Sequence, residues 1–434
     1  MQRTGHIIQV EDISTFKKQL LQWAQQFNVA IWLDSNNYQQ KYSNFDAVLA
    51  VDAFSEIETS YLNAFSQLKK FQTKTNDYIF GYLGYDLKND IEKLASTNSD
   101  GLHFSDLYFF QPKKLFFIKG TTVEVKYLND FKNEIEADLY EIKSQPTTKT
   151  QQPTNNSIKI KLRIHKDEYY KKINQLLQHI HRGDIYEATF CQEFYSENST
   201  INPLEIYHHL NDISKPPFAT FFKKEDKYLL SASPERYLKK TGNQLISQPI
   251  KGTEKRAENL EEDLKLIAAL EKNPKERAEN IMIVDLVRND LSHSAEKGTV
   301  KVDELCKVYT FEQVHQLIST ISCTVKSTIH PVDIIKDTFP MGSMTGAPKI
   351  SALKIIEELE ETKRGLYSGS VGYFSPNGDF DFNVIIRSIL YNAEKKYVSY
   401  SVGGAITALS IPEKEYEECL LKAKAMKHVL LNLK

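Results

Sequence analysis

The chain has 434 residues, of which 41% are hydrophobic and 26% are charged, and its formal net charge is −2. This is enough material for a large buried core, in two or three domains or in one unusually large one. The near-balance of 55 basic and 57 acidic side chains argues against nucleic acid or an anionic membrane as the partner.

The four cysteines (Cys191, Cys306, Cys323 and Cys419) lie far apart and form no CxxC pair. This spacing indicates a reducing compartment and no thiolate metal site. The N-terminus has no apolar signal-peptide core, and no apolar run is long enough to span a bilayer. We therefore expect a soluble cytoplasmic protein.

In chain order, the first 142 residues mix strand-like and helix-like segments. Apolar runs predict strands at 30–34, 78–85 and 114–118, and the spacing over 54–71 predicts a helix. Residues 144–157 are polar and nearly devoid of apolar side chains, which is typical of a linker or exposed loop. We divide the chain into an N-terminal region (1–143), a linker (144–162) and a C-terminal region (163–430).

Helices and strands alternate in the C-terminal region. We expect a helix at 167–181, stopped by Gly183, and another from Asn273-Pro274, because asparagine caps helices and proline suits the first turn. Further helices should follow Pro348 and Pro412. Strands are expected at 368–374, 380–391 and 397–401, and this mixture indicates an α+β fold with long antiparallel strands.

Lys251 lies in the run Gln248-Pro-Ile-Lys-Gly-Thr253, which reads as a strand end and tight turn. Pro249 restricts φ and Gly252 permits close backbone approach, so the lysine side chain between them is held in place. Such a lysine is most often a surface cation. It is a nucleophile where a pocket desolvates it or where neighbouring charges lower its pKa.

Two pairs of glutamates have helical i, i+3 spacing: Glu276 with Glu279, and Glu415 with Glu418, which Lys422 follows one turn later. Each pair taken alone is most simply a solvated helix face. If the two helices converge, the four carboxylates repel one another and need a divalent cation, for which Mg²⁺ is suited.

Glu235 stands in the turn Ser233-Pro-Glu-Arg236. A carboxylic acid there can serve as a general acid if burial raises its pKa. The commoner alternative is a turn carboxylate paired with Arg236.

Two features are suited to binding an anion. The loop 339–349 is rich in small residues and leads into a helix N-terminus, where free N–H groups suit a carboxylate or phosphate, although a helix cap without ligand has the same pattern. Arg387 interrupts the apolar segment 382–390, and a buried arginine needs an anionic partner. That partner is either an internal carboxylate or an anionic substrate.

Taken in order, these motifs resemble the chorismate-utilising enzymes, which include anthranilate synthase component I, aminodeoxychorismate synthase component I, and the isochorismate and salicylate synthases. The resemblance covers about residues 163–430, and more loosely the N-terminal region through Trp32-Leu-Asp-Ser35 and Phe80-Gly-Tyr-Leu-Gly-Tyr-Asp86. It implies one large body of two packed antiparallel β-sheets flanked by helices. The motifs that carry it are Ser233-Pro-Glu-Arg236, Pro249-Ile-Lys-Gly-Thr253, Pro274-Lys-Glu-Arg-Ala-Glu-Asn280, Val284-Asp-Leu-Val-Arg-Asn-Asp-Leu291, Gly342-Ser-Met-Thr-Gly-Ala-Pro-Lys349, Tyr367-Ser-Gly-Ser-Val-Gly-Tyr373, Ile385-Ile-Arg-Ser388 and Glu415-Tyr-Glu-Glu418.

The resemblance also implies roles for individual residues. The two helical glutamate pairs would hold Mg²⁺, which binds the ring carboxylate of chorismate: Glu279 and Glu418 directly, Glu276 and Glu415 in or just behind that shell. Glu235 matches the general acid that assists loss of the C4 hydroxyl. The remaining matches are substrate-binding positions, with the first three at the enolpyruvyl carboxylate: Tyr367, Arg387, Gly403, Ser343, Lys422, Gly252 and Thr253.

Lys251 decides which member of the family the chain resembles. Anthranilate synthases usually carry alanine in this turn, whereas aminodeoxychorismate synthases often carry lysine. The implied mechanism has Lys251 attack C2 of chorismate while Glu235 protonates the departing C4 hydroxyl. Ammonia then adds at C4 and the lysine leaves, giving 4-amino-4-deoxychorismate for the synthesis of 4-aminobenzoate and folate.

Two further positions refine this assignment. Isochorismate and salicylate synthases carry a lysine that activates water where this chain has Glu187, so attack of water at C2 is disfavoured. The family often has histidine where this chain has Gln316, with His315 one place earlier. We count Gln316 with the catalytic residues, as a side chain that can hydrogen-bond the hydroxyl but does not readily exchange a proton.

The chain contains no glutaminase motif and no appended lyase domain, so the resemblance implies ammonia from a separate glutamine amidotransferase subunit. One alternative is anthranilate synthase component I, which makes a precursor of tryptophan. Another is a non-catalytic relative that binds chorismate or tryptophan as a regulatory subunit. Some relatives bind tryptophan near a motif that resembles Leu33-Asp-Ser35.

Overall fold

The computed structural model describes residues 2–38, 41–92, 94–146, 158–312 and 314–431. Within these ranges the chain forms an α+β fold, and every pairing between its named strands is antiparallel. The predicted architecture is confirmed. None of the helices in these ranges has the length and apolar character needed to cross a membrane.

The N-terminal strands form the junction from which the rest of the sheet extends. β3 and β5 are long and pair along their whole lengths, with a register shift between Ala53 and Ser55 that separates two halves. One half of this pair continues into β2 and the other into β4. The strands of this region are β1 (Arg3–Gln9), β2 (Val29–Asp34), β3 (Ala47–Thr59), β4 (Ile79–Leu83), β5 (Leu107–Lys119) and β6 (Thr122–Leu128).

Two arms extend from this junction, so the two predicted sheets are joined into one hydrogen-bonded network of 20 strands. The first arm continues from β2 through β9 (Phe218–Lys224), β10 (Lys227–Ser233), β19 (Ser388–Asn392), β20 (Tyr397–Thr407) and β8 (Glu187–Ser196), with β7 (Lys161–Leu162) and β16 (Gly346–Ala347) at its edge. The second continues from β4 through β17 (Ser370–Phe374), β18 (Phe380–Val384), β11 (Arg236–Thr241), β12 (Gln244–Gln248) and β15 (Val314–Thr324), which also pairs with β13 (Ile250–Lys255) and β14 (Lys301–Thr310).

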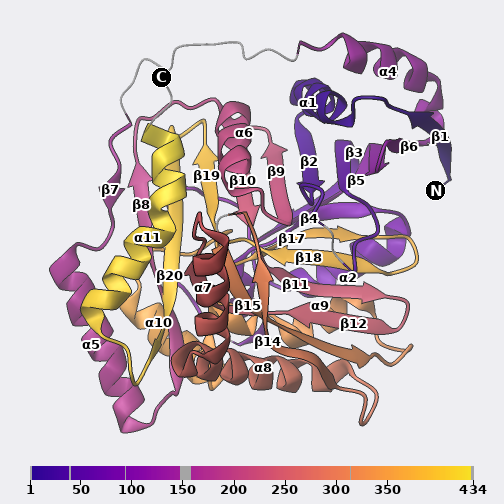
Figure 1. Cartoon of the computed structure of the whole chain (residues 1–434). Helices are drawn as coiled ribbons and strands as arrows, with labels where there is room; N and C mark the ends of the chain where they lie inside the picture. The colour runs from indigo at the N-terminus through magenta and orange to yellow at the C-terminus, as the bar shows by residue number, and fades with distance from the viewer. Residues whose placement is uncertain (1, 39–40, 93, 147–157, 313, 432–434) are drawn as a thin grey trace.

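Apolar side chains of both arms form one shared cluster. It joins Ile31 and Phe222 of the first arm to Phe80, Leu238 and Phe382 of the second. A second cluster covers the other face of the first arm, where helices pack. In Figure 1 the long C-terminal helix lies along β20.

The helices cap and flank the sheet as their sequences predict. Asn273 accepts hydrogen bonds from the backbone N–H groups of Lys275 and Glu276, and Gly183 ends its helix at φ 88°. The α-helices are α1 (Ile13–Trp23), α2 (Ala64–Thr75), α3 (Lys88–Ile91), α4 (Ile135–Ser144), α5 (Lys166–Arg182), α6 (Pro203–Ser214), α7 (Leu260–Lys272), α8 (Pro274–Ser294), α9 (Pro331–Thr338), α10 (Lys349–Leu359) and α11 (Pro412–Leu431), with 3₁₀ turns at Ala24–Gln26, Tyr85–Leu87, Asn129–Glu134 and Gly342–Met344.

Two local predictions are wrong. The segment 54–71 is not one helix, because β3 runs to Thr59 before α2 begins at Ala64. The segment 380–391 is not one strand, because Arg387 adopts φ 52° between β18 and β19. Most of the predicted linker, residues 147–157, lies outside the described residues.

Candidate functional site

Lys251 lies on β13, where the backbone brings it against the start of β8. Its Nζ is 3.2 Å from Oε1 of Glu187, a fully buried carboxylate. The next residue, Gly252, has φ +91°, and a Cβ there would lie 3.1 Å from Oε2 of Glu276. The backbone angle favours glycine, and a side chain here would also press on Glu276, so the turn depends on Gly252 and sets Lys251 beside Glu187.

The charge state of Lys251 follows from these surroundings. Burial acts to lower the pKa of its ammonium group, but the negative charges of Glu187 and Glu279 outweigh that effect, so the pKa lies above its ordinary value. The lysine is therefore held as an ammonium ion in the resting structure. This differs from the sequence interpretation, in which a pocket lowers the pKa. A nucleophilic Lys251 has to transfer a proton before it attacks.

Glu235 lies between β10 and β11 and is 4% exposed. Burial raises its pKa to about 7, against the opposing effects of a hydrogen bond with Ser343 and of the charge on Lys251. Arg236 turns away and pairs with Asp381 at 3.0 Å. The alternative of a turn carboxylate paired with Arg236 is therefore wrong, and Glu235 holds its proton below about pH 7, as a general acid must before it donates.

The raised pKa makes a prediction about stability. In the unfolded chain Glu235 loses its proton near its ordinary value of 4.5, and in the folded chain near 7. Its contribution to stability is therefore complete below pH 4.5 and falls as the pH rises to about 7, by roughly 3 kcal/mol. The side chain of Glu235→Gln stays neutral at every pH. The difference in unfolding free energy between this variant and the parent should therefore shift in favour of the variant by roughly 3 kcal/mol between pH 4.5 and pH 8. Chemical denaturation at both pH values measures the difference, and a difference independent of pH would contradict the raised pKa.

The two glutamate pairs converge, which their spacing alone could not establish. Lys275 Nζ is 3.7 Å from Glu279 Oε1 on the same helix and 3.7 Å from Glu415 Oε1 on α11. Lys422 pairs with Glu418 at 2.6 Å and donates to the carbonyl of Gly403 at 2.9 Å. The N-terminal turns of α8 and α11 therefore face each other with four carboxylates between them.

These carboxylates suit a divalent cation in their chemistry. Glu279 is largely buried, its Oε1 accepts no hydrogen bond, and burial raises its pKa to about 7. Across the described part of the chain, no three His, Cys, Asp or Glu side chains are already gathered in an arrangement that could hold a metal ion. Lys275 lies between the two helices instead, so an incoming cation would displace its ammonium group.

Arg387 lies against the middle of α11, beside Lys422. Its Nη1 donates to the backbone carbonyl of Lys422 at 3.4 Å, and among the described residues no acidic side chain forms an ion pair with it. Burial lowers the pKa of Arg387, opposed by the nearby carboxylate of Glu418. Of the two partners that the sequence left open, the structure disfavours the internal one, and a half-buried guanidinium without an ion-pair partner among the described residues favours binding of an external anion.

Of the other candidate substrate-binding residues, Tyr367 and Lys422 lie near this arginine, whereas Ser343 lines a separate small cavity beside Glu235. Tyr367 Oη is 3.8 Å from Cys191 Sγ, and Cys191 is the strand partner of Gly403, where a Cβ would lie 2.4 Å from the same sulfur. A cavity beside them is lined by Gln316, Arg387, Lys422, Pro234, Phe311 and Met426, among others.

Gln316 faces this cavity from β15. Its Oε1 is buried and accepts no hydrogen bond, and its backbone pairs with that of Thr253 on β13. An acceptor left in this state is suited to a hydroxyl donor from a ligand. His315, one place earlier, is directed elsewhere, with Nε2 2.9 Å from Asp263 Oδ1.

Leu33, Asp34 and Ser35 line a second cavity, at the end of β2. Tyr373 and Arg236 complete its walls, and Arg236 also lines the small cavity behind Glu235. The motif reminiscent of a tryptophan site thus lies in a separate cavity from Arg387.

Two charged residues of the site, Glu187 and Lys275, were not among the residues predicted from the sequence. Glu187 was considered only as a position that lacks lysine, yet it is the carboxylate nearest to Lys251. The one signal in the sequence is that Glu187 is a charged residue in the mostly apolar segment 185–194, which could have indicated a buried ion pair. Lys275 had no such signal, because an i, i+4 lysine on a helix is common on solvated surfaces.

Comparisons with known proteins match most of the length of the chain. A family model described as "chorismate binding enzyme" matches residues 28–428. The anthranilate synthase component I-like protein of Synechocystis is 35% identical over 354 residues, which cover 80% of this chain and 71% of that protein. Aminodeoxychorismate synthase component 1 of Bacillus subtilis is 31% identical over 387 residues, covering 85% and 82%. The crystal structure of anthranilate synthase component I from Streptococcus pneumoniae has the same fold, with a TM-score of 0.79, 24% identity, and coverage of 90% and 93%.

Proposed function

The chain belongs to the family of chorismate binding enzymes, and from this premise we propose that it converts chorismate and ammonia to 4-amino-4-deoxychorismate. The product is a precursor of 4-aminobenzoate and folate. The relatives named aminodeoxychorismate synthase support this activity.

The observation that carries the proposal is the position of Lys251. It lies close enough to Glu235 that each charge influences the pKa of the other, and Glu187 holds its ammonium group in place. A lysine in this position favours amination at C4. It would also crowd the space at C2 that anthranilate formation requires.

The reaction begins with a proton transfer from the Lys251 ammonium to Glu187, which leaves a free amine. That amine forms a bond to C2, the double bonds of the ring shift, and the C4–O bond breaks as Glu235 gives its proton to the departing hydroxyl. Ammonia then bonds to C4 and the lysine nitrogen leaves C2 as a neutral amine. Glu235 takes the extra proton of the new ammonium group and Glu187 returns its proton to Lys251, so both groups are reset.

We propose that Glu279 and Glu418 bind Mg²⁺ directly and that Glu276 and Glu415 support it. The bound ion would neutralise the carboxylates and hold the ring carboxylate of chorismate. Arg387 and Tyr367 would hold the enolpyruvyl carboxylate, beside the backbone of Gly403. Ser343, Gly252, Thr253 and Lys422 would line the remaining space around the ring.

Removal of divalent cations should therefore abolish turnover, and Mg²⁺ should restore it. Glu279→Gln should weaken Mg²⁺ binding by at least about tenfold, because a neutral amide replaces a charged ligand. Isothermal titration with Mg²⁺ measures this without turnover. Glu261→Gln, which changes an exposed carboxylate paired with Lys265, is the matched control. Equal Mg²⁺ affinity in both variants would show that Glu279 is not a ligand.

Ammonia would come from glutamine through a separate amidotransferase subunit, as the name "component 1" of the bacterial relatives suggests. The four free cysteines fit a reducing cytoplasm. With ammonium salts in place of the partner, this chain alone should still turn over.

The test is a coupled assay with chorismate, Mg²⁺ and ammonium chloride. Chorismate should disappear only when the enzyme is present, and 4-aminobenzoate should form only after a 4-amino-4-deoxychorismate lyase is added. Anthranilate fluorescence without the lyase would assign the chain to the tryptophan pathway. No chorismate consumption at all would favour a regulatory relative.

A further inference from the structure

Arg364 has every donor of its side chain satisfied inside the protein. Its guanidinium is 3% exposed, and its planar face lies 4.4 Å from the ring centre of Tyr85. Nε and Nη2 donate to Glu360 at 2.9 and 2.6 Å. The remaining N–H groups donate to the carbonyls of Met344 and Thr189 at 2.7 and 2.8 Å and to the Ser368 hydroxyl at 3.4 Å.

These acceptors are direct neighbours of the candidate substrate-binding residues. Met344 follows Ser343, and Ser368 follows Tyr367. Glu360 extends the contact by accepting the backbone N–H of Cys191 at 2.8 Å, and the sulfur of Cys191 contacts Tyr367. One planar side chain therefore sets the relative positions of three separate chain segments, two of which carry candidate substrate-binding residues.

The N-terminal region holds the segment that carries Arg364. The carboxylate of Asp86 accepts the backbone N–H of Gly365 at 2.9 Å, and the N–H of Tyr85 donates to the carbonyl of Gly365 at 2.7 Å. Lys363 pairs with Asp106 at 3.2 Å. The residues on both sides of Arg364 are thus fixed to the N-terminal region.

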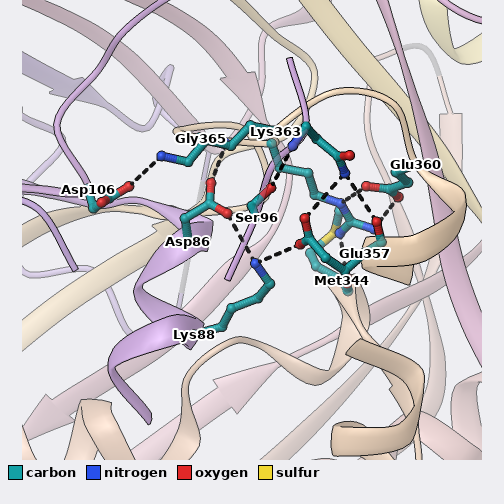
Figure 2. A network of polar contacts seen from close by, with 11 residues as sticks. Asp86, Lys88, Ser96, Asp106, Met344, Glu357, Glu360, Lys363 and Gly365 are labelled. Atoms are coloured by element: carbon teal, nitrogen blue, oxygen red, sulfur yellow. Dashed lines mark hydrogen bonds and ion pairs between the residues drawn. The ribbon is translucent and has the colours of Figure 1, made fainter. Parts of the chain in front are cut away.

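A fully buried lysine completes the arrangement. Lys88 is 0% exposed and lies between Asp86 and Glu357, 3.1 Å from each. Figure 2 shows it bridging the N-terminal segment to the helix that precedes Glu360. Glu357 lies in the last turn of α10 and Glu360 directly follows that helix, so the two cations fix one helix end from two sides.

We propose that Arg364 is a positioning residue that holds Ser343 and Tyr367 at the substrate, and that the N-terminal residues Tyr85, Asp86 and Lys88 hold Arg364 in place. The inference rests on the proposed function, because it assigns a role within the same site. It gives the N-terminal region a part in substrate binding although none of these three residues belongs to the candidate site.

The test compares Arg364→Lys with a matched control, Arg3→Lys. Arg3 is also buried, at 7% exposure, and bonds Asp77 and the carbonyl of Pro112, but it contacts no candidate site residue. Lysine keeps the charge and loses the planar fork. Because a misplacement of about 1 Å costs up to about 10²-fold, Arg364→Lys should raise the KM for chorismate by about 10- to 100-fold, and more than it lowers kcat.

Arg3→Lys should lose thermal stability but keep the parent KM within about threefold, since its effect is confined to packing. Equal KM values in Arg364→Lys and Arg3→Lys would overturn the positioning role. If Arg364→Lys does not fold, Tyr85→Leu removes the ring beneath the guanidinium, and its KM should rise in the same direction; an unchanged KM would overturn the proposal equally. A parent that neither binds nor consumes chorismate would instead overturn the proposed function.

Discussion

Replacing Lys251 with alanine should lower kcat for 4-amino-4-deoxychorismate formation by roughly 10³-fold or more, a loss between that of a general acid and that of a nucleophile. The variant loses the amine that forms the bond to C2, so ammonia has to displace the C4 hydroxyl without a covalent intermediate. It should also lose any adduct between protein and substrate. Rapid quenching followed by intact-protein mass spectrometry detects that adduct in the parent.

Lys255→Ala provides the control for Lys251→Ala, because Lys255 is an exposed lysine at the end of the same strand. It should keep the parent rate and form the same adduct. A Lys251→Ala enzyme with parent kinetics would remove the covalent mechanism. Lys251 would then act only as a positive charge in the site and not as a nucleophile.

Glu235→Gln should lower kcat by about 10²- to 10⁴-fold, the usual loss when a general acid is removed. The amide has the same shape but cannot give a proton to the departing hydroxyl. Since burial raises the pKa of Glu235 to about 7, the parent holds the active acid form below pH 7 and loses it above. The rate of the parent should therefore fall as the pH rises through 7, and the residual rate of the variant should not show this fall.

Glu254→Gln, at a partly exposed position of the same strand as Lys251, is the control for Glu235→Gln. It should retain both the parent rate and the decline above pH 7. If Glu235→Gln shows the same decline as the parent, another group is responsible for it, and Glu235 is not the acid. Steady-state rates between pH 5.5 and 9 distinguish these outcomes.

Much of the fold could be predicted because local signals and tertiary structure agree. Asn273 and Pro274 begin α8 where capping chemistry places them, and Gly183 ends α5 in the left-handed region. The prediction failed where tertiary contacts override local pattern. The end of β3 has helix-like apolar spacing but pairs with β5. The apolar segment around Arg387 has the pattern of one strand, but the positive φ of Arg387 interrupts that strand.

In the candidate site, too, local sequence predicts some features and tertiary contacts decide the others. Glu235 and Lys251 were identified from turns, and the glutamate pairs from helical spacing, but spacing on one helix contains no information about the other. Only the structure brings α8 and α11 together, through Lys275. The charge state of Lys251 was also beyond the sequence, since it depends on Glu187, which is 64 residues away in the chain.

The most direct measurement uses ¹⁵N-labelled ammonium with chorismate, Mg²⁺ and this chain alone, and identifies the product by mass spectrometry and NMR. We expect 4-amino-4-deoxychorismate, with ¹⁵N bonded to C4 and the enolpyruvyl group retained. A labelled anthranilate accompanied by free pyruvate would contradict this expectation, because amination would then have occurred at C2.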